Sequence, residues 1–182
     1  MVTIRKISDV LRITGKEMKA IEEAAQVLAA GGIVVFPTDT VYGLMAAGKD
    51  VNESARKLNL LKGRGVEKPV AALINLTPEI IDFVRELDHR HGMHLAKLVP
   101  GPLTLVVSRE DARKLVPGGL HDLPYERIGF RVPDYPILNT LIELVGGWIL
   151  ATSANPAGEA DRTTLHAALN ALDSERIALA LD

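Results

Sequence analysis

The chain has 182 residues, of which 47% are hydrophobic, and its formal net charge at pH 7 is −2. This length suits a single domain with a core of its own over residues 1–182. The absence of cysteine excludes disulfides, thiolate metal sites and cysteine nucleophiles, and the near-neutral charge excludes a polycation for nucleic acid. Because the chain has no apolar signal-peptide core and no run of about 20 apolar residues, we expect a cytoplasmic protein without a membrane partner.

Apolar residues at steps of three and four predict helices, and short β-branched runs predict strands. Strands that alternate with helices favour the α/β class. The segment 111–127 is polar and rich in glycine and proline, which is typical of a surface excursion. The predicted elements, in chain order, are a helix over 16–30, a strand over 33–36, a helix over 52–61 capped by Asn52, a strand over 70–74, a helix from Pro78 capped by Thr77, a helix near 94–98, strands over 103–107 and 128–132, a helix over 136–145, a strand over 148–151, a helix capped by Thr163 or Thr164, and a strand over 177–181.

Two polar clusters follow predicted strands directly. Thr38-Asp39-Thr40 comes after the first strand, and Ser153-Ala154-Asn155 comes after the strand that starts at Trp148. Ligands of open α/β sheets bind outside the carboxyl ends of strands, so we expect the two clusters to face one crevice. The alternative is that their hydroxyls only cap helices and turns.

A basic loop with two glycines lies just before the strand at 70–74. It carries Lys62, Arg64 and Lys68, whose charges suit phosphates, and Gly63 and Gly65 allow a polyphosphate to approach the backbone. The P-loop pattern G-x-x-x-x-G-K-[ST] is absent, so a P-loop NTPase is excluded. The alternative is a solvated basic loop without a ligand.

Arg131 alternates with the apolar residues Phe130 and Val132, so its side chain projects from the other face of a buried strand. A charge at such a place needs a partner, which is either an acid of the protein or an anionic ligand.

Three histidines are close in sequence, but their spacing argues against a metal site. His89, His91 and His94 are two, three and five residues apart, whereas a helical metal pair needs two histidines four apart. Ser153 is not part of a G-x-S-x-G motif, so we do not expect a hydrolase nucleophile.

Five segments match the motifs of one family in the order in which that family has them, and they lie between Gly31 and about Thr164. Through them the chain resembles the YrdC family of threonylcarbamoyl-AMP synthases (L-threonylcarbamoyladenylate synthases). The matching segments are Phe36–Leu44 for P-T-[DE]-T-x-Y-G-L, Lys62-Gly63-Arg64 with Lys68-Pro69 for K-x-R…K-P, Pro100–Thr104 for P-G-P-x-T, Phe130–Pro133 for V-R-x-P, and Ser153–Asn155 for S-x-N.

The resemblance implies a twisted, open, mixed sheet flanked by helices, with a deep electropositive groove. It implies a nucleotidyltransferase that joins ATP, L-threonine and bicarbonate into threonylcarbamoyl-AMP and pyrophosphate, for N6-threonylcarbamoyladenosine modification of tRNA. Mg²⁺ would accompany the ATP, with no tightly bound metal site in the protein. Further partners would be tRNA and a downstream threonylcarbamoyl transferase complex.

The resemblance also implies roles for single residues. Catalysis would rest on positioning and electrostatic stabilisation, mainly by Lys62 and Arg64, because adenylation needs no protein nucleophile. The implied roles are ATP binding for Lys62, Arg64, Lys68, Ser153 and Asn155, threonine binding for Thr38, Thr40, Arg131 (to the carboxylate) and Ala151 (through its backbone), and a place in the groove wall for Thr104.

The chain departs from the family pattern at several positions. Asp161-Arg162-Thr163 stands where S-P-T is usual, and an acid there repels phosphates unless Mg²⁺ or Arg162 intervenes. Arg127 replaces a threonine that some members have near the nucleotide, and members commonly continue beyond the strand at 177–181. Two alternative functions stay open, which are an RNA-binding module without turnover and a carbamoyltransferase that handles carbamoyl-adenylate.

Overall fold

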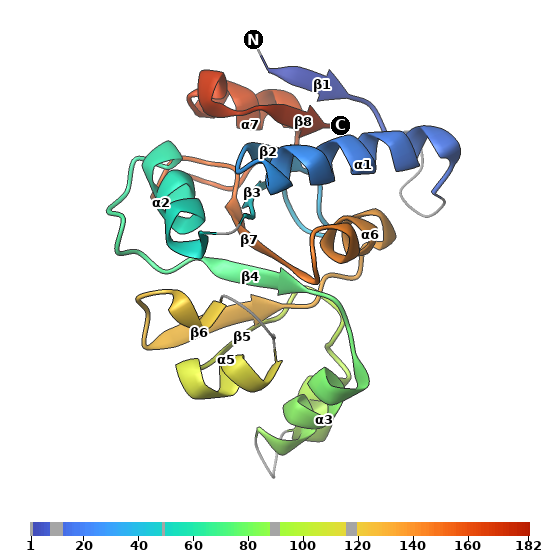
Figure 1. The fold of residues 1–182 in the computed structure, drawn as a ribbon, viewed down its shortest axis with the longest axis vertical. Helices are drawn as coiled ribbons and strands as arrows, with labels where there is room; N and C mark the ends of the chain where they lie inside the picture. Colours follow the sequence, from blue (N-terminus) through green and yellow to red (C-terminus); the bar gives the residue numbers. More distant parts are fainter. Residues whose placement is uncertain (1, 8–12, 49, 88–91, 116–119) are drawn as a thin grey trace.

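The computed structural model describes residues 2–7, 13–48, 50–87, 92–115 and 120–182 (Figure 1). Within them the fold centres on one eight-stranded mixed sheet with the order β1-β8-β2-β3-β7-β4-β6-β5. Neighbours β1–β8, β8–β2 and β4–β6 are parallel, and β2–β3, β3–β7, β7–β4 and β6–β5 are antiparallel. The strands are β1 (Thr3–Arg5), β2 (Ile33–Phe36), β3 (Gly43–Ala46), β4 (Ala71–Ile74), β5 (Thr104–Ser108), β6 (Arg127–Arg131), β7 (Trp148–Ser153) and β8 (Leu179–Leu181).

Side-chain caps define the start of most long helices. The hydroxyls of Thr14, Thr77 and Thr164 and the carboxylate of Asp50 accept hydrogen bonds from backbone N–H groups of the first turn, which otherwise lack partners. The helices are α1 (Gly15–Ala29), α2 (Val51–Leu61), α3 (Pro78–Glu86), α4 (Gly92–Ala96), α5 (Arg109–Leu115), α6 (Pro136–Leu144) and α7 (Leu165–Ala171), with short 3-10 turns η1 (Leu120–Asp122) and η2 (Ser174–Arg176).

The sheet separates two hydrophobic cores. Helices α1 and α6 lie side by side on one face (Figure 1) and bury Ile21 and Leu141 against it. Helices α2, α3, α5 and α7 contribute to the core on the other face, where Leu58 of α2 is buried. Side chains of β2 alternate between the two cores, because successive residues of a strand point to opposite faces.

Helices α1 and α6 do not cover β5 and β6 on their face of the sheet. On β6, Ile128 and Phe130 are buried in the core of the other face, so Gly129 and Arg131 point toward the α1–α6 side. Val106 of β5 is 60% exposed there. This part of the sheet is therefore a floor on which a ligand can lie.

Several expectations were wrong in detail. Asp50, not Asn52, caps α2, and the supposed excursion at 111–127 contains most of α5, all of η1 and the first residue of β6. Strand β3 was not predicted, because four successive buried residues show no alternation of polar and apolar side chains. Strand β1 was missed because it is short and exposed. None of the helices in the described ranges has the length and apolar character needed to cross a bilayer.

Candidate active site

A groove of about 490 Å³ opens beside the uncovered floor of the sheet. Six of the residues predicted from the sequence line it together, although they come from distant parts of the chain. Its lining consists of Thr38, Thr40, Val41, Tyr42 and Gly43 from the β2–β3 hairpin, Pro69, Val70, Ala71 and Leu73 at β4, Thr104 of β5, Arg131 of β6, Ala151, Thr152 and Ser153 of β7, and Asp161.

Strand β3 brings the two predicted polar clusters together. It pairs antiparallel with both β2 and β7, so these two strands run in the same direction and end at the same edge of the sheet. Gly43 lies opposite Ser153, and the Ala154 N–H donates to the Tyr42 carbonyl at 2.8 Å. The prediction that both clusters face one crevice is therefore confirmed.

Gly129 keeps the floor of the groove low. A Cβ atom at this position would lie 3.3 Å from Cγ2 of Thr104 and 3.6 Å from Cβ of Ala71. A longer side chain would extend from this point into the space above the strands, so glycine leaves room for a ligand to approach the backbone of β6.

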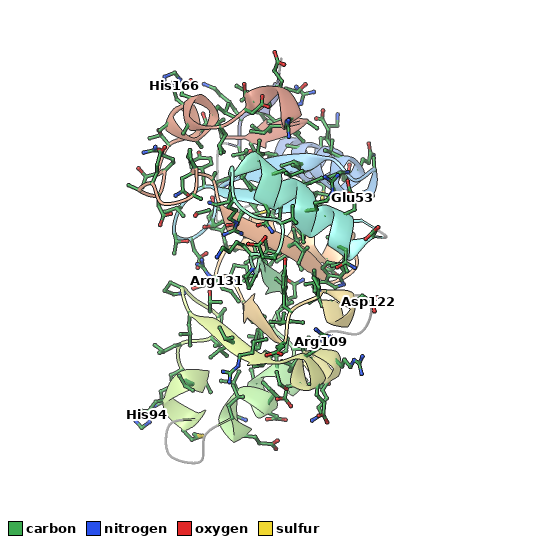
Figure 2. All side chains as sticks on the ribbon, turned by 90° about the vertical axis from the view of Figure 1, so that its left-hand side faces the viewer. Glu53, His94, Arg109, Asp122, Arg131 and His166 are labelled. Carbon is green, nitrogen blue, oxygen red and sulfur yellow. The ribbon has the colours of Figure 1, made fainter. Side chains whose placement is uncertain are left out.

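Arg131 has a protein acid as its partner. Its Nη2 donates to Oδ1 of Asp39 at 2.6 Å, its Nη1 to Oγ1 of Thr40 at 2.9 Å, and its Nε to the Gly101 carbonyl at 3.0 Å. Both charged side chains are 13% exposed. Figure 2 shows Arg131 at the waist of the molecule, between the part that contains α2 and the part that contains α5. No pattern in the sequence indicates that Asp39, among the acids of the chain, is this partner.

Thr38 organises the hairpin loop that carries it. Its hydroxyl donates to the Val41 carbonyl at 2.8 Å and accepts from the backbone N–H groups of Thr40 and Val41. It also lies 3.0 Å from the Thr40 hydroxyl. The alternative interpretation of this cluster, that its hydroxyls stabilise turns, thus holds for Thr38, while Thr40 links the turn to Arg131.

Lys62 is buried directly behind Ser153. Its Nζ donates to the Ser153 carbonyl at 2.7 Å, to Oδ1 of Asn155 at 3.0 Å and to the Ser153 hydroxyl at 3.3 Å. The pKa of this amine is lowered to about 8, mainly by burial and also by the positive charge of Arg64, while the carboxylate of Asp161 partly opposes the shift. Lys62 therefore holds the loop after β7 in place, and its charge lies close to the groove.

The pKa of Lys62 predicts a pH effect on stability. The amine loses its proton near pH 8 in the folded chain but near its ordinary value of 10.5 in the unfolded chain. Between these pH values the unfolded chain binds more protons than the folded chain. The contribution of Lys62 therefore makes the free energy of unfolding increase as the pH rises, by about 1 kcal/mol per pH unit. Urea unfolding at pH 8, 9 and 10 should show a steeper rise for the wild type than for Lys62→Met, and parallel curves would contradict the prediction.

Asn59 organises the basic loop and was not expected from the sequence. Its side chain is fully buried; Nδ2 donates to the carbonyls of Val66 and Lys68, and Oδ1 accepts from Nε of Arg64 at 2.6 Å. Arg64 also reaches the Pro69 carbonyl at 3.3 Å, so its guanidinium spans the loop. An amide on the otherwise apolar face of a predicted helix was the signal that would have found Asn59.

The structure does not bring all predicted ATP ligands into the groove. Ser153 lines it, Lys62 and Asn155 lie behind Ser153, Arg64 lies within the loop, and Lys68 is exposed. The charged residues that do line the groove are Arg131, neutralised by Asp39, and Asp161. An electropositive groove thus stays a prediction.

Among the described residues, no group of three or more His, Asp or Glu side chains is arranged to hold a metal ion. His94 is exposed and lies at the lower end of the molecule in Figure 2, away from Arg131 near the middle. His89 and His91 lie outside the described residues.

Comparison with known proteins gives a consistent result. The family model of Sua5, YciO and YrdC proteins, which carries the description telomere recombination, matches residues 26–182. Two similar proteins are named threonylcarbamoyl-AMP synthase. That of Pyrococcus abyssi is 33% identical over 144 residues, which are 79% of this chain and 41% of the relative, and that of Cellvibrio japonicus is 31% identical over 143 residues, which are 79% of this chain and 73% of the relative.

Solved structures agree with the sequence match. The crystal structure of P. abyssi Sua5 complexed with L-threonine aligns with a TM-score of 0.73 at 28% identity, over all of this chain and 50% of the other. The chain therefore spans about half the length of the archaeal relative or less.

Proposed function

The chain belongs to the Sua5, YciO and YrdC family, and on that basis we propose that it is a threonylcarbamoyl-AMP synthase. Its substrates would be L-threonine, bicarbonate and ATP, and its products threonylcarbamoyl-AMP and pyrophosphate. The observation that carries the proposal is the groove itself, which joins the hairpin hydroxyls, the Arg131 guanidinium and Ser153 backed by the Lys62 ammonium. These groups suit a ligand with a carboxylate at one end and phosphates at the other.

The proposed reaction has two bond-forming steps. Bicarbonate takes up a proton and loses water to give carbon dioxide. The neutral amine of threonine then attacks the carbon dioxide and loses a proton, which gives a carbamate. A carbamate oxygen then attacks the α-phosphorus of ATP, and the bond to the β-phosphate oxygen breaks, so pyrophosphate leaves. Neither step needs a protein nucleophile, because positioning and stabilisation of phosphate charge supply most of the acceleration.

The residues divide between the two ends of the groove. Arg131 would meet the threonine carboxylate, with Thr38, Thr40 and the backbone of Ala151 around the amino acid and Thr104 in the wall. The triphosphate would lie toward Ser153, which Lys62 and Asn155 support from behind. Arg64 and Lys68 would approach the phosphates from the basic loop when ATP binds.

Mg²⁺ would enter as part of the substrate, since ATP carries it. Mg²⁺ binds through one or two carboxylates together with substrate phosphates rather than in an all-protein cage. Asp161 lines the groove near Lys62, and its exposed carboxylate makes no hydrogen bond or ion pair with any described residue. An acid at this place repels bare phosphate and attracts a bound cation.

We expect Asp161→Asn to weaken the response of ATP binding to magnesium. The variant should bind ATP more tightly than the wild type in EDTA, because a repulsive charge is gone, and its gain in affinity on adding Mg²⁺ should be about tenfold smaller. Calorimetric titrations of ATP with and without Mg²⁺ measure both quantities without turnover. Asp82→Asn, which changes an exposed acid of α3, is the matched control. An equal magnesium effect in all three proteins would contradict the prediction.

The proposal as a whole is tested by pyrophosphate release. The protein is incubated with MgATP, bicarbonate and L-threonine, and each substrate is omitted in turn. Release that requires both threonine and bicarbonate supports a synthase. Release that instead follows carbamoyl phosphate would indicate a carbamoyltransferase, and salt-sensitive tRNA binding without any release would indicate an RNA-binding module.

We also propose that the product serves tRNA modification in the cytoplasm, through a separate threonylcarbamoyl transferase. Because an acyl-adenylate is a reactive mixed anhydride, a consuming partner must capture it before water does. Product made alone should therefore decay to AMP, and adding tRNA with the transferase should convert it to modified tRNA.

A further inference from the structure

Asp39 is the acid that neutralises Arg131 in the groove. We infer that Asp39 is a positioning residue, which holds the guanidinium in the orientation that receives the carboxylate of the amino-acid substrate. The inference rests on the proposed function, because it takes an amino acid as the molecule that Arg131 meets. The inference assigns a role in substrate binding to Asp39, a residue that contacts no reacting atom.

The hydrogen bonds of Arg131 leave part of its guanidinium available. Three of its five N–H groups donate to Gly101, Thr40 and Asp39, one from each nitrogen. One N–H on Nη1 and one on Nη2 have no partner among the described residues. These two N–H groups are available to donate charge-assisted hydrogen bonds to a carboxylate, and such bonds are stronger than those between neutral groups.

Asp39 lies behind Arg131 and not in the ligand space. Arg131 and Thr40 line the groove, whereas Asp39 is not among the lining residues. Its carboxylate gives only Oδ1 to the guanidinium, at 2.6 Å, and its Oδ2 accepts from the backbone N–H of Asp134 at 3.3 Å. This second bond ties the carboxylate to the segment after β6, so it supports Arg131 from the protein side.

Asp39 also balances the charge of Arg131 in the ligand-free protein. A guanidinium that is 13% exposed, without a counter-charge, would be costly to bury in the ligand-free protein. Asp39 removes that cost before the substrate arrives, and a monodentate contact leaves Arg131 able to bind a second carboxylate. The substrate therefore meets a preorganised group and does not have to order a long side chain on binding.

Two other roles for Asp39 make different predictions. If its carboxylate contacted the substrate amine directly, its loss would affect every ligand that carries that amine. If it competed with the substrate carboxylate for Arg131, its removal would tighten threonine binding. A ligand pair that differs only in the carboxylate separates these cases, and L-threoninol, in which a hydroxymethyl group replaces the carboxylate, is such a partner for L-threonine.

The experiment compares the wild type, Asp39→Asn and the control Asp173→Asn, which alters an exposed ion pair with Arg176. It measures KM for L-threonine and for ATP in pyrophosphate release, and the inhibition constant of L-threoninol. We expect Asp39→Asn to raise KM for threonine about tenfold, with KM for ATP and the threoninol constant within about twofold of the wild type. The control should match the wild type throughout, and circular dichroism verifies that all three are folded.

The outcomes separate the inference from the proposed function. An equal loss for threonine and threoninol, an unchanged KM for threonine, or tighter threonine binding would each overturn the positioning role while the synthase stands. A wild type without threonine-dependent release would overturn the synthase. In that case calorimetric binding of L-threonine and L-threoninol to the same proteins tests Asp39 directly, and weaker binding of threonine alone in Asp39→Asn is the expected result.

Discussion

Lys62→Met should reduce kcat/KM for synthesis by at least about 100-fold while the chain still folds. The ammonium of Lys62 joins the Ser153 carbonyl and hydroxyl to the Asn155 amide, and no other described residue donates to all three. Methionine has a similar volume but no donor, so the loop after β7 loses its anchor and the groove loses the positive charge behind Ser153. Hydrogen bonds to a charged group contribute about 1.5–3 kcal/mol each, which is enough for this loss.

Lys57→Met provides the matched control on the same helix. Lys57 also donates to a backbone carbonyl, that of Gly31 at 2.7 Å, but Gly31 is not a groove residue, whereas Lys62 contacts the groove residue Ser153. Its loss should change kcat/KM by less than about threefold. Pyrophosphate release at saturating bicarbonate measures both variants. Similar losses in the two would mean that Lys62 acts through general stability and not through the site.

Asn59→Ala should lower the free energy of unfolding by about 3 kcal/mol. The side chain is fully buried, and its removal leaves the Val66 carbonyl and the Nε of Arg64 without their amide partner, while the Lys68 carbonyl keeps the hydrogen bond from the Tyr125 hydroxyl. Unsatisfied buried polar groups of this kind cost about 1–3 kcal/mol each. The basic loop should lose its conformation as well, so the Kd for ATP should rise more than the Kd for threonine.

Asn52→Ala is the control for that measurement. Asn52 lies on the same helix and its amide donates to the Asp122 carbonyl at 3.2 Å, but the side chain is exposed. The expected change is within about 0.5 kcal/mol, as for other surface substitutions. Urea unfolding monitored at Trp148 gives both values, and a difference of less than about 1 kcal/mol between the variants would show that the Asn59 network has little effect.

The sequence predicted most elements well, because strong local signals define them. The helix signals at Thr77-Pro78 and at Thr164 depend only on neighbouring backbone groups, so they could be recognised without tertiary information. The strand at 33–36 was predicted with its observed bounds, since a run of β-branched and aromatic residues between Gly32 and Pro37 has few other interpretations. These confirmed elements, together with β7, supply both polar clusters of the groove.

The rest depends on contacts that no local pattern encodes. Which acid would neutralise Arg131 is decided by the meeting of β6 with the β2–β3 hairpin, and nothing in the spacing between Asp39 and Arg131 indicates it. Whether Lys62 enters the groove or lies behind Ser153 depends in the same way on packing between α2 and β7. The motifs thus identified six of the residues that line the groove, while the mutual arrangement of these residues required the three-dimensional structure.

The connection between β2 and β3 tolerates no change in its number of residues. Residues 37–42 connect Phe36 to its partner Gly43. Within these few residues lie the Thr38 and Thr40 hydroxyls, which line the groove, and the Tyr42 carbonyl, which accepts the hydrogen bond from the Ala154 N–H. Most surface loops tolerate insertions, but here an added residue would either displace Thr40 from Arg131 or slip β3 by one position. A slip would exchange the sides of Leu44 and Met45, which belong to different cores. Redesign of this protein can therefore vary the side chains of the hairpin more freely than the number of residues in it.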